Sequence, residues 1–189
     1  MTARPFMNPA RRMTEPPPVP TWRRSGRTHD GRLFAIRPID IEDAQGDRDF
    51  LMRLSEDSRY KRMMGICREP SPELIDRLVH VDWHRSMAFV AIAGPDDTQT
   101  IIGAARYAAT PTAEEAEFAI AVADEWQSRG VGSALLQTLI EYARSQGLSR
   151  LQGLVLANNR RMLEFARKHA FRARPLPGEY TLVEITRDL

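Results

Sequence analysis

The residues best suited to chemistry lie in one stretch, from Ala116 to Gly147. It begins with an apolar run that contains a single carboxylate, Glu117, and continues into the segment QSRGVG at 127–132. An apolar pattern with helical spacing follows, so we expect a strand, a glycine-containing turn and a helix in that order. The start of such a helix presents free backbone N–H groups and the positive end of its dipole. The stretch therefore predicts a site for a phosphate-bearing ligand.

The glycine segment differs from two better-known phosphate motifs. No Gly-Lys-Ser/Thr follows it, as a P-loop requires, and it lacks the third spaced glycine of a dinucleotide fingerprint. Gly130 and Gly132 leave the backbone N–H groups open to a pyrophosphate, and Gln127 and Arg129 add polar and cationic reach. We therefore expect a phosphate site of another kind.

Composition is that of an ordinary soluble protein, with 42% hydrophobic and 28% charged residues. No apolar run approaches the roughly 18 residues of a membrane helix, so we expect a cytoplasmic protein without a membrane partner. Because Cys67 is the single cysteine, an intrachain disulfide and a cysteine-based zinc site are excluded, and we expect no metal. Net charge is only +2, with arginines concentrated before residue 33, which argues against a nucleic-acid-binding domain.

Two regions follow from the proline and apolar patterns. Residues 1–31 are rich in proline and arginine and show no periodicity, which predicts a disordered or extended tail. This tail is either a solvated linker or a basic arm that contacts a partner. Residues 32–189 carry the periodic segments and form the expected domain.

The periodic segments alternate between strand and helix. Expected strands span 33–38, 87–93, 100–108, 115–123, 151–156, 171–174 and 180–186, with two or three helices before 87, one from 130 to Gly147 and one capped by Asn158 or Asn159. This order mixes hairpins with crossovers. It predicts an α+β fold with a mixed, mostly antiparallel sheet of about six to seven strands flanked by about four helices.

Three motifs resemble those of a known family. The pattern Gln127-x-x-Gly130-x-Gly132 resembles the acyl-CoA pyrophosphate signature of the GNAT superfamily of N-acyltransferases. Downstream, Asn159-x-x-Met162 and Lys168-x-Ala170-Phe171 resemble its second CoA-side motif, and the similarity covers about 33–186. Four further strings are similar to the acetyltransferase domain of Pat-type bacterial protein lysine acetyltransferases: Arg37-Pro38, Met87-Ala88-Phe89-Val90, Ala116-Glu117-Phe118-Ala119 and Ala157-Asn158-Asn159-Arg160-Arg161-Met162.

The resemblance implies acetyl-CoA as co-substrate, bound along the 115–124 strand where it separates from the 151–156 strand. Pantetheine would pair with the strand edge near Ala121, Val122 and Ala123, and Asn159 would contact the pantetheine or phosphate side. The pyrophosphate would meet the backbone amides of Gln127, Ser128, Arg129, Gly130, Val131, Gly132 and Ser133.

Position and resemblance together make Glu117 the expected general base. An attacking amine must first lose a proton, since a lysine ammonium has a reference pKa near 10.4. Glu117 alternates with Phe118 and so points away from it, and its apolar neighbours predict desolvation, which makes a carboxylate a stronger base. The alternative is a glutamate facing water at a strand end, as we expect for Glu114 and Glu115.

Two residues depart from the family pattern. Many members carry a tyrosine as general acid where this chain has Ala166, so Tyr107, Ser133 or no side chain would take that role. Ala170 replaces the usual glycine before Phe171, which suggests that this turn does not need a positive φ.

Three functions remain open from the sequence. The first is an N-acetyltransferase that transfers acetyl directly from acetyl-CoA to a primary amine, preferably a protein lysine, as a monomer or dimer. The second is transfer to a small amine such as a polyamine, amino acid or antibiotic, against which the basic residues Arg59, Lys61, Arg62 and Arg68 argue. The third is an inactive acyl-CoA-binding regulatory domain, suggested by Ala166.

Overall fold

Eight strands form one sheet in the computed structural model, which describes residues 21–95, 98–110 and 114–189. Their order is β1-β2-β3-β4-β5-β6-β8-β7, and all neighbours are antiparallel except β5 and β6. The strands are β1 (Arg24–Arg27), β2 (Leu33–Pro38), β3 (Ser86–Ala93), β4 (Thr100–Ala109), β5 (Glu115–Val122), β6 (Arg150–Leu156), β7 (Arg172–Leu176) and β8 (Glu179–Asp188). This topology confirms the expected α+β class.

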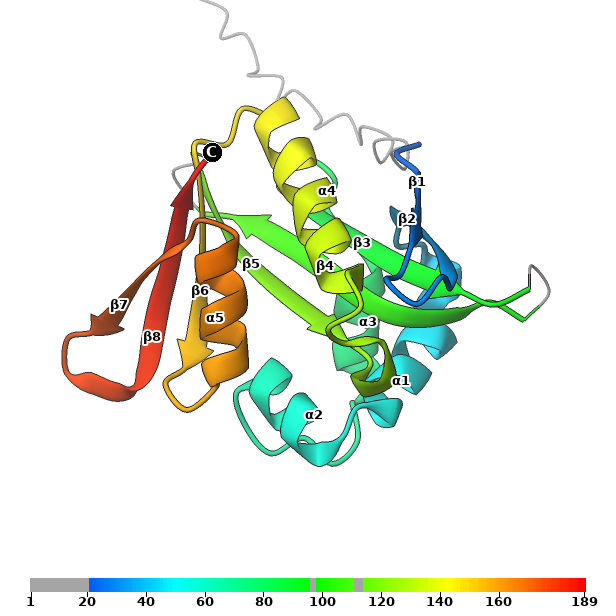
Figure 1. The fold of residues 1–189 in the computed structure, drawn as a ribbon, viewed down its shortest axis with the longest axis horizontal. Helices are drawn as coiled ribbons and strands as arrows, with labels where there is room; N and C mark the ends of the chain where they lie inside the picture. Colours follow the sequence, from blue (N-terminus) through cyan, green and yellow to red (C-terminus); the bar gives the residue numbers. More distant parts are fainter. Residues whose placement is uncertain (1–20, 96–97, 111–113) are drawn as a thin grey trace, which may run out of the picture.

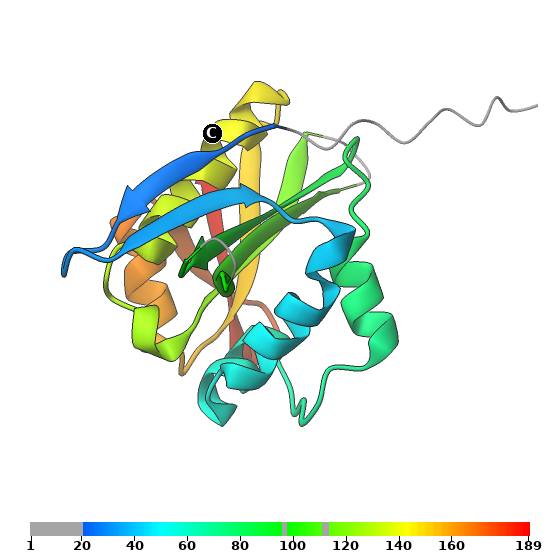
Figure 2. The same ribbon diagram turned by 90° about the vertical axis from the view of Figure 1, so that its right-hand side faces the viewer.

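Helices cover both faces of the sheet (Figures 1 and 2). In the described residues they are α1 (Ala44–Arg53), α2 (Glu56–Met63), α3 (Pro72–Val79), α4 (Val131–Ser145) and α5 (Arg160–Lys168), with short 3-10 turns η1 (Ile41–Asp43) and η2 (Asp124–Trp126). α4 and α5 lie on one face, α1 and α3 lie on the other, and α2 lies near the end of β5. None of these helices has the length and apolar character needed to cross a membrane.

Two hydrophobic cores fix the sheet between the helix layers. Along β3, Met87 and Phe89 belong to the core beneath α4, whereas Val90 and Ile92 belong to the core with α1 and α3. Successive strand residues point to opposite faces, so the continuous apolar run of β3 is buried on both sides. The α4 residue Leu139 is fully buried in the core that contains Met87 and Phe89. These layers hold the start of α4 at the end of β5.

Local sequence signals place several helix ends as expected. Asn159 accepts a hydrogen bond from the Met162 N–H at 3.2 Å and begins α5, and Ser71 caps α3 in the same way. Gly147 follows α4 with φ 79°, the left-handed geometry that a glycine at this position permits. The starts of α3 and α5 and the end of α4 are therefore encoded locally.

The N-terminal boundary differs from the sequence prediction. Residues 24–27, which we assigned to the tail, form β1 and pair with β2 in the register Arg24–Ile36 to Arg27–Leu33. This strand brings the sheet to eight strands, one more than the upper expectation. The strand has the sequence RSGR, without apolar alternation, and Trp22 just before it packs edge to face with Tyr142. Residues 1–20 of the expected tail lie outside the described residues.

Candidate active site

β5 and β6 separate partway along their length. Their parallel ladder joins Glu115 to Arg150, Ala116 to Leu151 and Glu117 to Gln152. Both strands continue beyond these pairs, to Val122 and to Leu156. The expected separation of the two strands is therefore present, and it leaves one backbone edge of β5 open to a ligand.

A cavity of about 1070 Å³ occupies this opening and extends to the start of α4. It is walled by β5, β6, α2, α4, α5 and the β1–β2 turn. The predicted site residues along it are Glu117, Ala121, Val122, Gln127, Ser128, Gly130, Gly132, Ser133 and Asn159. The fold therefore brings most of the residues chosen from the sequence to one cavity.

Three predicted residues lie outside the cavity lining. Ala123 is buried, and its N–H donates to the Ile102 carbonyl at 2.9 Å, so it is not free to pair with pantetheine. Val131 is buried in the core beneath α4. Arg129 turns away to an ion pair with Asp30. Ala123 lies just beyond the end of β5, and Val131 is the first residue of α4, on the helix face that packs on the core.

The start of α4 offers free N–H groups to the cavity. Its N-cap is Gly130, with φ 99°, and no side chain caps the helix. An L-residue at this φ is strained, which explains the glycine. The first-turn amides of Val131, Gly132 and Ser133 precede the first intrahelical bond of the helix, donated by Ala134 to the Gly130 carbonyl. This end of the cavity has the donor set and dipole that favour a phosphate.

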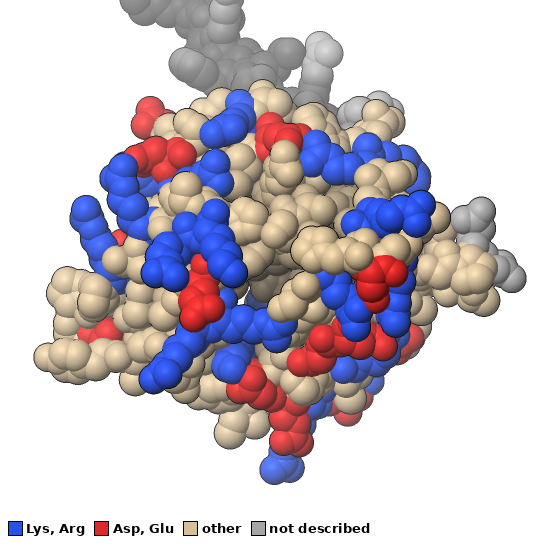
Figure 3. Space-filling model, in the orientation of Figure 1, with Lys and Arg blue, Asp and Glu red and all other residues tan. Residues whose placement is uncertain are grey.

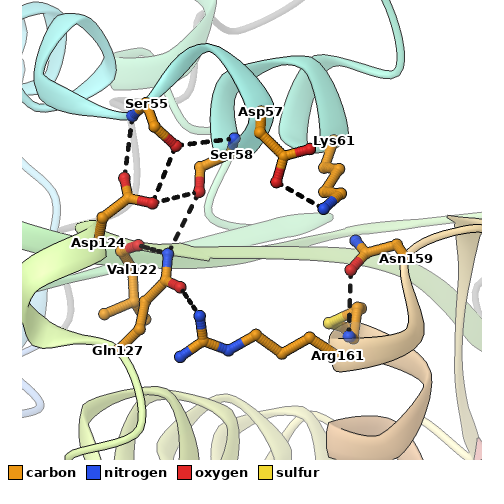
Figure 4. Close-up of polar contacts among 10 residues, drawn as sticks. Ser55, Asp57, Ser58, Lys61, Val122, Asp124, Gln127, Asn159 and Arg161 are labelled. Atoms are coloured by element: carbon orange, nitrogen blue, oxygen red, sulfur yellow. Dashed lines mark hydrogen bonds and ion pairs between the residues drawn. The ribbon is translucent and has the colours of Figure 1, made fainter.

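Gln127 joins the glycine segment to both neighbouring elements (Figure 4). Its Nε2 donates to the Val122 carbonyl at 2.8 Å, and its Oε1 accepts from Arg161 of α5. Arg161 Nη2 also donates to Ser128 Oγ at 2.8 Å. Arg161 thus spans the cavity mouth from α5. We did not select it from the sequence, although its place two residues after Asn159, at the same helix start, was an available signal.

Asp124 fixes α2 to the turn that leads into the glycine segment (Figure 4). Its carboxylate accepts from the Ser55 N–H at 2.9 Å, the Ser55 hydroxyl at 2.9 Å and the Ser58 hydroxyl at 2.7 Å. Partial burial opposes ionisation, but the hydrogen bonds from Ser58 and Ser55 outweigh it and lower the pKa of Asp124. The negative charge also lies beside the α2 N-terminus, where the helix dipole favours it.

Replacing Asp124 by alanine tests this link. Asp124→Ala removes the acceptor of three hydrogen bonds at the α2 N-terminus, so we expect a loss of about 1–2 kcal/mol in the free energy of unfolding. Urea denaturation monitored by circular dichroism measures it. Glu125→Ala is the matched control, since the hydrogen bond of Glu125 to Arg129 runs through its backbone oxygen. Equal stability of the two variants would show that Asp124 does not hold α2.

Glu117 lies in the cavity, but its environment differs from the expectation. The side chain is exposed, while Phe118 beside it is buried. The predicted alternation is confirmed, and the predicted desolvation of Glu117 by its sequence neighbours is wrong for the free chain. The neighbours Ala116 and Phe118 turn to the opposite face of β5, because side chains alternate along a strand.

The candidates for a general acid differ in position. Tyr107 is 4% exposed in the core with α4 and does not line the cavity. Burial raises its pKa above the usual range. Ser133 lines the cavity, and its Oγ lies 3.0 Å from His169 Nε2. Burial and the charge of Arg187 lower the pKa of His169. Ala166 is buried, and Phe165 occupies the cavity wall beside it.

The turn after α5 corrects a second expectation. Ala170 has φ 61°, in the left-handed region, so this turn does require a positive φ. The replacement of the usual glycine by alanine therefore places a side chain in a strained backbone conformation, and it is no sign of a relaxed turn. The hydrogen bond from the Phe171 N–H to the Ala166 carbonyl, at 3.0 Å, closes the helix end around it.

Charged side chains of both signs surround the cavity. Figure 3 shows a hollow near the centre of this face with Lys and Arg and also Asp and Glu side chains around it. The Lys and Arg side chains that line the cavity are Arg27, Lys61, Arg62, Arg161 and Lys168. Burial lowers the pKa of the Arg62 guanidinium, and the nearby Asp47 charge opposes this shift. The carboxylates of Asp57, Glu117, Asp124 and Glu164 also line the cavity, and Asp57 pairs with Lys61, so the charge of the lining is mixed.

Comparisons with known proteins agree with this geometry. Residues 51–171 match the model of the acetyltransferase (GNAT) family. The chain is 36% identical over 154 residues to acetyltransferase PA5475 of Pseudomonas aeruginosa, covering 82% of this chain and 83% of that protein. It is 30% identical to acetyltransferase Pat of Mycolicibacterium smegmatis, covering 77% of this chain but 41% of that longer protein.

Solved structures extend the likeness to the whole fold. The GNAT domain of S. lividans PAT superposes with a TM-score of 0.81 at 29% identity and covers 89% of this chain and 97% of that domain. A cAMP-binding acyltransferase from Mycobacterium smegmatis superposes with a TM-score of 0.59 at 25% identity, covering 87% of this chain and 47% of that protein.

Proposed function

This chain belongs to the GNAT family of acetyltransferases, and we propose that it transfers the acetyl group of acetyl-CoA directly to a lysine ε-amine of a protein. One observation carries the proposal: the uncapped start of α4, the open edge of β5 and Glu117 share one cavity. The first suits a pyrophosphate, the second suits pantetheine, and the third is a carboxylate within reach of the same space. Members of this family use acetyl-CoA, which carries these groups.

The cofactor would lie across the gap between β5 and β6. The amides from Gly130 to Ser133 would hold the pyrophosphate, with Gln127 and Ser128 at its rim. Because Asn159 Oδ1 already caps α5, its contact with the cofactor would come from the amide nitrogen. The thioester would then lie toward Glu117, on the cavity side of β5.

In the proposed reaction the neutral amine attacks the thioester carbonyl. A C–N bond forms, the C–S bond breaks, and coenzyme A leaves as the thiolate, which takes up the second proton that the nitrogen loses as the amide forms. Glu117, directly or through a water, takes the proton that the ammonium must lose. Since Glu117 is exposed in the free chain, its desolvation would come from the cofactor and acceptor that fill the cavity. A thiol has a reference pKa near 8.5, so departure does not require the missing tyrosine at Ala166.

The exposed residues of α2 and of the loop after it, on the proposed acceptor side, support a protein substrate. Tyr60, Met64 and Ile66, on α2 and the loop after it, are 42%, 38% and 87% exposed. Met64 lines the cavity, and exposed apolar side chains of this size on one helix and its following loop suit a polypeptide surface better than a small cation. The resemblance of four sequence strings to Pat-type protein lysine acetyltransferases points the same way. Lys61 and Arg62 on this wall disfavour a polyamine.

A panel of acceptors tests the proposal. We expect the kcat/KM of coenzyme A release to be at least tenfold higher with lysine-containing proteins or peptides than with polyamines, amino acids or aminoglycosides. Preference for one of the small amines would support the alternative small-molecule acetyltransferase. Tight acetyl-CoA binding without turnover on any acceptor would support a regulatory acyl-CoA-binding domain.

A further inference from the structure

The turn between β1 and β2 is attached to the glycine segment. The His29 N–H donates to the Arg129 carbonyl at 3.2 Å, and Asp30 forms an ion pair with the Arg129 guanidinium. Nearby, the guanidinium carbon of Arg32 lies 5.2 Å from the ring centre of Trp126 in η2. These contacts hold the hairpin against the segment that precedes α4, although about 100 residues separate them in the sequence.

Two polar side chains of this hairpin line the cavity, Arg27 and His29. His29 Nε2 is the nearest atom to the place where a Cβ on Gly130 would stand, at 3.4 Å. The imidazole therefore lies over the helix N-cap, on the side of the segment opposite α5. Arg27 Nη1 donates to the Gly31 carbonyl at 2.9 Å, which restrains its long side chain beside the cavity.

The polar groups that the hairpin turns toward the cavity are hydrogen-bond donors, because its carboxylate is already paired. Its one carboxylate, Asp30, is engaged by Arg129, by Arg32 at 3.6 Å and by the Thr28 hydroxyl. The remaining polar groups toward the cavity, on Arg27 and His29, are hydrogen-bond donors or can become so. A phosphate held by the α4 amides has oxygens that point away from the helix, and these need further partners.

We infer that His29, together with Arg27, is an additional ligand for the phosphate groups of the cofactor, donating from the hairpin side while the α4 amides donate from the other. The inference rests on the proposed use of acetyl-CoA. The hairpin lies before residue 51, outside the segment that matches the family model, so the shared family core does not supply these two side chains.

Binding measurements with two cofactor forms test the inference. Isothermal titration calorimetry would give Kd for coenzyme A and for 3′-dephospho-coenzyme A with the unaltered chain, His29→Ala and Arg27→Ala. We expect each variant to raise the Kd for coenzyme A by about tenfold or more, as the loss of a hydrogen bond to a charged group does. His84→Ala is the control, since His84 is also exposed and lies outside the cavity lining.

Comparing the two ligands distinguishes contact with the 3′-phosphate from contact with the pyrophosphate. A loss seen with coenzyme A but absent with the dephospho form supports contact with the 3′-phosphate, and an equal loss with both supports contact with the pyrophosphate. Unchanged Kd values for both ligands in both variants would overturn the inference and leave the proposed function intact. Failure of the unaltered chain to bind coenzyme A would instead overturn the proposed function itself.

Discussion

Glu117→Gln is expected to lower kcat by about 10²–10⁴-fold while leaving the KM for acetyl-CoA unchanged, because general-base catalysis contributes a rate factor of that size. Glutamine keeps the shape of the side chain but cannot accept a proton from the ammonium. Glu117 is exposed, so the substitution should change the free energy of unfolding by less than about 0.5 kcal/mol. Steady-state assay of coenzyme A release, with thermal unfolding as a check, measures both effects.

Glu164 provides the matched control for this variant. It is also an exposed glutamate that lines the cavity, but it comes from α5 instead of β5. Glu164→Gln removes the same charge from the same cavity and should keep kcat within a factor of about three. If both variants lost rate equally, the effect would arise from the electrostatics of the cavity, and Glu117 would lose its role as base.

Gly130→Ala should affect the cofactor more than any other single change in the glycine segment. Alanine at φ 99° costs about 1–2 kcal/mol in backbone strain. The new Cβ would stand 3.4 Å from His29 Nε2, so relief of the strain would move the α4 amides or the hairpin. We expect the KM for acetyl-CoA to rise by about tenfold or more.

Strain and cofactor contact can be separated with a second glycine. Gly178, in the turn between β7 and β8, has φ 80°, and no atom lies within 4 Å of the place where its Cβ would stand. Gly178→Ala therefore carries the backbone cost without touching the cavity, and it should lower the melting temperature while leaving the KM for acetyl-CoA unchanged. A similar KM in both variants would show that the left-handed N-cap does not position the amides for the cofactor.

The strand, turn and helix of the site were predictable because their signals are local. The apolar alternation around Phe118, the glycines of 130 and 132, and the periodicity up to Gly147 each act within a few residues. The separation of β5 from β6 was expected only through the family resemblance, since strand pairing depends on contacts between distant segments.

The remaining features depend on tertiary contacts that periodicity does not encode. β1 is short and polar, and it forms because β2 offers an edge to pair with. Arg161 reaches Gln127 only after α5 and β5 have assembled. The apolar neighbours of Glu117 predict desolvation, but they turn to the other face of β5, and alternation leaves Glu117 exposed. Ala170 adopts a positive φ although the residue type argued against it, because the α5 C-terminus closes there.

In the proposed reaction, acetyl passes directly from acetyl-CoA to a lysine amine within the cavity beside Glu117. Rapid mixing of the enzyme with isotope-labelled acetyl-CoA and a lysine-containing protein, followed by mass spectrometry of both proteins, tests it most directly. We expect label to appear on a lysine ε-amine of the acceptor, one for each coenzyme A released, and at no time on the enzyme. Label that first accumulates on Cys67 or another enzyme side chain, or that never reaches a lysine, would contradict it.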